Sequence, residues 1–200
     1  MDLLDLDDHI SNLGIDPSAE HLEELFQLFK ADFIDNVFYF DGCKVKIDIA
    51  NSKEEGFEAY PHTFVKIITR GDKGKRSFDK KRANKIHWIR PILENKDTED
   101  VTCFQFLEAD GKIRDYFWFK EGNFLVVMEK ITPDYMIISC FHIRRFTFLV
   151  ELPFSFMAFV ISSSVSSLLD DKVTSSNRRV YITPCCLNEE TRLYSELKKI

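Results

Sequence analysis

The sequence is poor in the residues that build secreted or metal-binding scaffolds. Its 200 residues include five cysteines, at positions 43, 103, 140, 185 and 186, an odd number without framework spacing. The adjacent Cys185 and Cys186 are poorly placed to share a metal or a disulfide, so we expect reduced thiols and no metal site. The N-terminal run Met-Asp-Leu-Leu-Asp-Leu-Asp-Asp has no basic region of the kind that opens a signal peptide. These features predict a cytoplasmic protein.

The chain also lacks the short motifs of the common cofactor-dependent enzymes. It has no phosphate-cradling glycine loop, no dinucleotide-binding fingerprint, no His-Glu-x-x-His and no paired-carboxylate motif. ATP use, hydride transfer and metalloprotease chemistry therefore have no support in the sequence, and we expect no cofactor.

The net charge of −6 hides an uneven distribution along the chain. Residues 1–60 hold 4 basic and 15 acidic residues, whereas residues 61–150 hold 17 basic and 12 acidic residues. Within residues 64–90 there are 10 basic and 2 acidic residues, a net charge of +8. Because the local field steers a charged ligand, this middle region is suited to a polyanion. The structural alternative is a solvated helix face.

The N-terminal third predicts a helix followed by a hairpin. Asp16-Pro17 is a typical helix start, and apolar residues then recur at helical spacing, so we expect an amphipathic helix over residues 17–34. Asp41-Gly42 lies between two β-rich runs, 37–40 and 44–49, which is a strong signal for a two-residue hairpin.

The middle of the chain predicts an α+β domain. We expect a short strand over 64–69, a basic loop over 71–75, and a helix from Phe78 to about Arg90, capped by Ser77 and ended by Pro91. Four antiparallel strands should follow, over 102–107, 112–119, 124–129 and 135–143, and the last should alternate strictly between its two faces. The predicted fold is thus an antiparallel sheet of four or five strands with a packed helix.

The C-terminal residues form a distinct extension in this scheme. Residues 153–169 contain no charge, which favours a buried or partner-docking helix, with a membrane segment as the alternative. We therefore divide the chain into an acidic helical segment (1–35), a central domain (36–150) and a partly helical extension (151–200).

The first candidate site residues surround the predicted strand and helix. His62 precedes the strand that carries Lys66 and Arg70, and an imidazole there can act as an acid or a base. Arg82, on the inner edge of the helix, can hold a phosphate bidentately, or it can close the fold by pairing with an aspartate. The same basic stretch supplies two further candidate RNA contacts, Arg76 and Lys85.

Two further candidates lie on the predicted strands. Arg114, Tyr116 and Trp118 alternate on one strand face, an arrangement that can stack a base and hold its phosphate, although core strands show the same alternation. Ser139 is a hydroxyl within an apolar strand and must find a partner there.

The order of these elements resembles a nuclease family. His62 with Arg70, then Arg82 ahead of Trp88-Ile89-Arg90-Pro91-Ile92, resembles the phage branch of the barnase–EndoU–colicin–RelE-like (BECR) fold. The Asp-Gly hairpin, Arg114 in an aromatic strand, Val126-Val127-Met128-Glu129-Lys130 and the ending over 135–143 extend the resemblance over about residues 36–145.

The resemblance implies a helical region on a four-stranded antiparallel sheet and metal-independent RNA cleavage through a 2′,3′-cyclic phosphate. It places His62, Arg82, Arg114 and Ser139 at the family's polar positions. Ser139 stands where the family has threonine, which keeps the hydroxyl, whereas Cys140 departs from the family's alanine. Such cleavage needs a base, an acid and a cation at the phosphorane.

We therefore expect an endoribonuclease-like toxin or effector, with RNA as substrate, an antitoxin or immunity protein as candidate partner, and no membrane partner. Two alternatives stay open: a non-catalytic phage or host-defence interaction protein, and an immunity protein that uses its acidic N-terminal surface. The opposite charges of residues 1–60 and 64–90 also suggest that the first helix screens the RNA surface; alternatively, it only covers apolar sheet surface.

Overall fold

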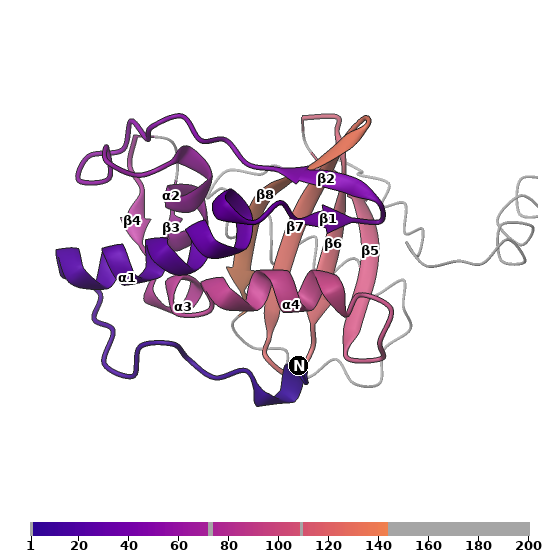
Figure 1. Cartoon of the computed structure of the whole chain (residues 1–200), viewed down its shortest axis with the longest axis horizontal. Coiled ribbons are helices and arrows are strands. Elements are labelled where there is room, and N and C mark those ends of the chain that lie inside the picture. Colours follow the sequence, from indigo (N-terminus) through magenta and orange to yellow (C-terminus); the bar gives the residue numbers. More distant parts are fainter. Residues whose placement is uncertain (1, 72–73, 109, 144–200) are drawn as a thin grey trace, which may run out of the picture.

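The computed structural model describes residues 2–71, 74–108 and 110–143. In this part of the chain, helices pack on a curled, mostly antiparallel six-stranded sheet, so the fold class is α+β (Figure 1). The helical elements are η1 (Leu3–Asp5), α1 (Ala19–Lys30), η2 (Ala31–Asp35), α2 (His62–Ile68), α3 (Lys80–Ala83), η3 (Ile86–Trp88) and α4 (Ile89–Glu94). The strands are β1 (Tyr39–Phe40), β2 (Cys43–Lys46), β3 (Thr69–Arg70), β4 (Ser77–Phe78), β5 (Val101–Leu107), β6 (Ile113–Phe119), β7 (Phe124–Ile131) and β8 (Asp134–His142).

The main sheet has the order β1-β2-β8-β7-β6-β5. Strands β5 to β8 form an antiparallel meander, and β2 joins its edge in parallel with β8. The sheet exceeds the four or five strands expected because the β1–β2 hairpin adds to this edge. Strands β3 and β4 form a separate two-stranded ribbon.

The predicted hairpin is confirmed by its backbone. Asp41 and Gly42 have φ angles of 50° and 73°, the left-handed pair that a tight hairpin of this kind requires. The first helix is confirmed as well, although its cap differs. Ser18, not Asp16, accepts the hydrogen bond from the His21 amide, and the helical path continues through η2.

The predicted strand over 64–69 is wrong, because most of these residues form helix α2. Pro61 precedes the first turn, and five of the seven helix residues are buried, so burial outweighs their preference for strands. The predicted helix from Phe78 to Arg90 is also wrong as one element. Asp79, not Ser77, caps the short helix α3, and Pro91 lies inside α4, in the first turn, where its missing N–H is not needed.

The predicted strict alternation of the last strand is wrong at its centre. Val127 pairs with Ser139, whereas the next residue, Met128, pairs with Ile137, so Ile138 is an extra residue in a β-bulge. The bulge shifts the phase of the strand. Cys140 therefore faces the helices together with Ile137, and Ser139 faces the other side of the sheet.

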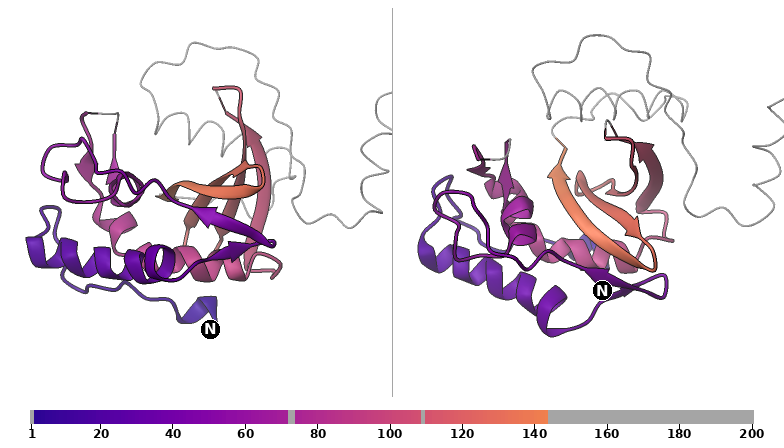
Figure 2. Two further views of the ribbon diagram at one scale, coloured as in Figure 1. Left: turned by 45° about the horizontal axis from the view of Figure 1, so that its top comes forward. Right: turned by 90° about the horizontal axis from the view of Figure 1, so that it is seen from above.

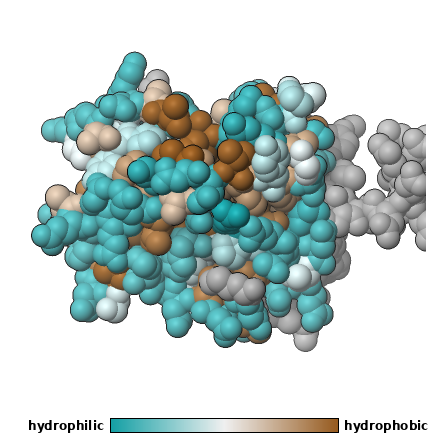
Figure 3. Space-filling view, in the orientation of Figure 1, coloured by the Kyte–Doolittle hydropathy of each residue, from teal (hydrophilic) through white to brown (hydrophobic). Residues whose placement is uncertain are grey.

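The two faces of the sheet differ in what covers them. On the first face, α1, α2 and α4 bury one large core that includes Phe29, Phe64 and Ile92, and both views of Figure 2 place α1 and α4 on this side of the curved sheet. The outer surface on this side is largely hydrophilic, with hydrophobic residues gathered in its upper part (Figure 3). The second face carries a separate apolar cluster, which we call the second-face cluster: Phe104, Tyr116, Trp118, Leu125 and Val127.

The N-terminal segment is tied into the first core. Leu6 and Leu13 are buried there, and the Asn84 side chain bonds both the amide and the carbonyl of Ile10. Within the described residues no helix is long and apolar enough to cross a membrane. Residues 153–169, for which a membrane segment was the alternative, and the rest of the predicted extension lie outside the described residues.

Candidate functional site

The second face of the sheet brings two rows of predicted residues together. The strand register sets Phe104, Tyr116, Val127 and Ser139 side by side across β5 to β8. Arg114 lies two residues before Tyr116, in the next row, where it pairs with Phe106. Strand geometry then separates the Cα atoms of Arg114 and Ser139 by roughly 12 Å. Both residues therefore share one face, as an active site would require.

Arg114 is the centre of an ionic network on this face. Its guanidinium lies 2.6 Å from Asp110 Oδ2, 3.2 Å from Glu129 Oε2 and 3.8 Å from Glu108 Oε1. Lys112 Nζ reaches the other oxygen of Glu129 at 2.6 Å. Three carboxylates thus surround Arg114.

The hydrogen bonds and charges within the network determine the protonation states of Glu129 and Tyr116. Burial alone would raise the pKa of Glu129, but hydrogen bonds from Lys112 and Arg114 outweigh burial and hold that pKa below its ordinary value. Burial raises the pKa of Tyr116, and so does the hydrogen bond that its hydroxyl donates to Glu108. At neutral pH the network therefore contains an ionised carboxylate and a neutral phenol.

Lys66 lies close enough to this network to sense its charges. Burial lowers the pKa of Lys66, and the positive charges of Arg76 and Arg114 lower it further, whereas Glu129 acts in the opposite direction. Among the described residues the Lys66 ammonium forms no ion pair. The lowered pKa and the absence of an ion partner among the described residues make Lys66 a candidate functional lysine.

His62 shares a helix face with Lys66, although not for the predicted reason. The two are four positions apart in α2, so they are neighbours on one helix surface. Arg70, expected beside them, lies beyond the helix in β3 and is exposed. The His62 side chain makes no hydrogen bond to another described residue.

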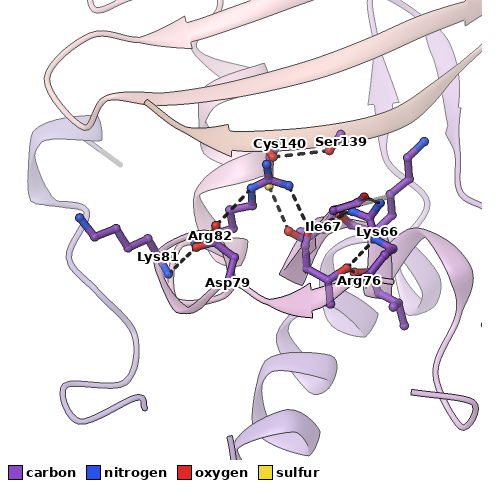
Figure 4. A network of polar contacts seen from close by, with 11 residues as sticks. Lys66, Ile67, Arg76, Asp79, Lys81, Arg82, Ser139 and Cys140 are labelled. Carbon is purple, nitrogen blue, oxygen red and sulfur yellow. Dashed lines mark hydrogen bonds and ion pairs between the residues drawn. The ribbon is translucent and has the colours of Figure 1, made fainter. Parts of the chain in front are cut away.

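Arg82 is buried between α3, the end of α2 and β8. Its Nη1 donates to the Thr69 carbonyl at 2.9 Å, its Nε lies 3.8 Å from Asp79 Oδ2, and its guanidinium stacks 4.6 Å from the Phe141 ring. Figure 4 shows Arg82 beside Cys140 on β8. Burial lowers the pKa of Arg82. These contacts match the structural alternative, in which Arg82 closes the fold.

Two other predicted RNA contacts are occupied by protein groups. The Arg76 guanidinium donates to the carbonyls of Lys66, Thr69 and Gly71 and to the Thr69 hydroxyl, which satisfies the C-terminal end of α2. Lys85 pairs with Asp8 at 2.9 Å and lies over the Trp88 ring, on the first face.

The predicted aromatic platform is also buried. Tyr116 stacks on Phe104 with ring centroids 5.1 Å apart and is 1% exposed, and Trp118 is 6% exposed. A base could stack on these rings only if the groups that bury them moved away.

Sequence reasoning missed the acidic part of this site, Glu108, Asp110 and Glu129, and also Lys112, which pairs with Glu129. A signal was present, because Glu129 ends an apolar strand run and lies on the same face as Arg114, where an unpaired carboxylate would be unfavourable. Among the described residues no group of three or more His, Cys, Asp or Glu is placed to hold a metal ion.

Comparisons with protein-family models, with curated proteins and with solved structures found no match for this chain. The nuclease resemblance therefore rests on the quoted residues alone.

Proposed function

We propose that this protein is a metal-independent endoribonuclease whose site is the charged half of the second face. The supporting observation is the pair of Arg114 and the ionised Glu129, 3.2 Å apart on one sheet face, with the unpaired Lys66 within their field. RNA transesterification requires a base for the 2′-hydroxyl and cations at the phosphate, and these residues supply both kinds of group.

In the proposed reaction, Glu129 takes the proton of the ribose 2′-hydroxyl as its oxygen attacks the adjacent phosphorus. Arg114 and Lys66 stabilise the negative charge of the phosphorane, whereas Ser139 is buried in the next row, where its hydroxyl donates to the Cys140 carbonyl. His62 protonates the leaving 5′-oxygen as the P–O bond breaks. The products are a 2′,3′-cyclic phosphate and a free 5′-hydroxyl. Arg82 acts as a positioning residue, because it joins α2, which carries His62 and Lys66, to α3.

A second candidate is a non-catalytic interaction protein with the same fold. Arg114 is already surrounded by three carboxylates, so a phosphate must compete with them for the guanidinium. In that case the chain binds its partner without turnover, and the network is structural.

An RNA cleavage assay with matched variants distinguishes the two candidate functions. Under the enzymatic proposal, Glu129→Gln and His62→Gln each lower the rate by about 10²- to 10⁴-fold. The controls Glu58→Gln and His21→Gln, outside the site, leave the rate unchanged. Wild-type protein that is folded and binds RNA without cleaving it would support the non-catalytic candidate instead.

A further inference from the structure

The central strands of the sheet are apolar on both faces. Strand β7 begins with the unbroken run Phe124–Met128, and the end of β6, Tyr116–Phe119, is entirely aromatic. Strands that read this way are covered on both sides, whereas a sheet with one solvated face alternates apolar and polar residues. Among the described elements, the helices cover only the first face of the sheet.

The second-face cluster needs a cover of its own. All five of its residues are buried, and Phe106, Ile138, Phe141 and Ile143 pack around them. Within the described residues, the elements that supply the rest of the hydrophobic core belong to the first face. Apolar side chains on a sheet face that no described helix covers are shielded from water only if another segment or a partner packs on them.

The path of the chain leads from β8 onto this face. Phe141 and Ile143, at the end of the described chain, already pack against the second-face cluster. Nine residues, 144–152, then precede the uncharged stretch 153–169. Fully extended, nine residues reach about 30 Å, and the distance from β8 to β5 is about 14 Å, so the tether is long enough.

We propose that residues 153–169 of the same chain cover the second-face cluster. Seventeen residues without a charge match an apolar surface, and as a helix they would be about 26 Å long, enough to cross β8 to β5. A tethered segment also has a high effective concentration, which favours it over a second copy or a separate partner. This inference does not depend on the ribonuclease activity.

The two tryptophans of the chain provide a direct test. Trp118 belongs to the second-face cluster and Trp88 to the first core. In the full chain, Trp88→Phe leaves Trp118 as the sole reporter, and Trp118→Phe leaves Trp88 as the control. Phe156→Asp with Val160→Asp places charges in the segment, and Thr174→Asp with Ser175→Asp places the same charges outside it.

Acrylamide quenching of Trp118 should increase several-fold with the charges at 156 and 160 and should not change with those at 174 and 175. Quenching of Trp88 should stay constant in both, which shows that the fold is intact. Unchanged Trp118 quenching in a folded 156/160 variant would overturn the proposal.

A second measurement covers the case in which the charged variant fails to fold. A photoreactive phenylalanine analogue at position 104 of the otherwise unchanged chain should cross-link to residues 153–169 of the same molecule. Cross-links to a second copy, or none within 153–169, would overturn the proposal.

Discussion

Replacing Arg82 by alanine tests whether this residue closes the fold. The change removes a charged hydrogen bond to the Thr69 carbonyl, which contributes about 1.5–3 kcal/mol. It also removes the contact with the Phe141 ring, which contributes about 0.5–2 kcal/mol. Asp79 keeps its hydrogen bonds to the α3 backbone, and Arg76 still serves the Thr69 carbonyl, so neither acceptor is left unpaired.

We therefore expect Arg82→Ala to lower the free energy of unfolding by about 2–5 kcal/mol, measured by urea denaturation followed by circular dichroism. For a chain of this length the melting temperature should fall by about 4–20 °C. Arg70→Ala is the control, since Arg70 is exposed in β3 and its removal should cost below about 1 kcal/mol. A loss below about 1 kcal/mol for Arg82→Ala would refute the structural role.

Three further predictions concern the N-terminal segment, a tight turn and the acid range. Asn84→Ala removes both hydrogen bonds to Ile10, so it should cost about 2 kcal/mol and speed hydrogen exchange over residues 2–13; unchanged exchange would contradict this. Gly122→Ala would place a methyl group against the buried Trp88 ring, so thermal melting should show a loss of about 1–3 kcal/mol. The folded-state pKa of Glu129 is lowered, so its stabilisation is present above the ordinary value of 4.5 and is lost as the pH falls through the lower, folded pKa. Glu129→Gln should flatten the urea midpoint against pH in that window, and an unaltered acid slope would show that the network is not intact in solution.

The sequence predicted the elements whose signals are local. The Asp41-Gly42 turn needs two left-handed residues, which few other pairs tolerate, and the strands of the meander alternate or run apolar over their whole length. Helix α2 could not be predicted in this way. Its residues Thr63–Ile68 prefer strands, and only tertiary burial on nearly every side makes them helical.

The candidate site could be predicted in part, where its residues follow a local pattern. Strand periodicity correctly put Arg114 and Tyr116 on one face, but the bulge at Ile138 was invisible in the sequence, and it determines which side Ser139 faces. Whether a basic residue is available to a ligand depends on contacts distant in sequence. Arg82 bonds the Thr69 carbonyl and Lys85 pairs with Asp8, neither of which composition can show.

The proposed reaction is metal-independent cleavage of RNA by way of the 2′-hydroxyl. The most direct measurement uses a short RNA oligonucleotide in EDTA beside the same oligonucleotide with deoxyribose at every position, with products identified by mass. We expect cleavage of the RNA to a 2′,3′-cyclic phosphate, an intact deoxyribose strand, and a rate that EDTA does not change. Loss of cleavage in EDTA, or equal cleavage of both strands, would contradict this proposal.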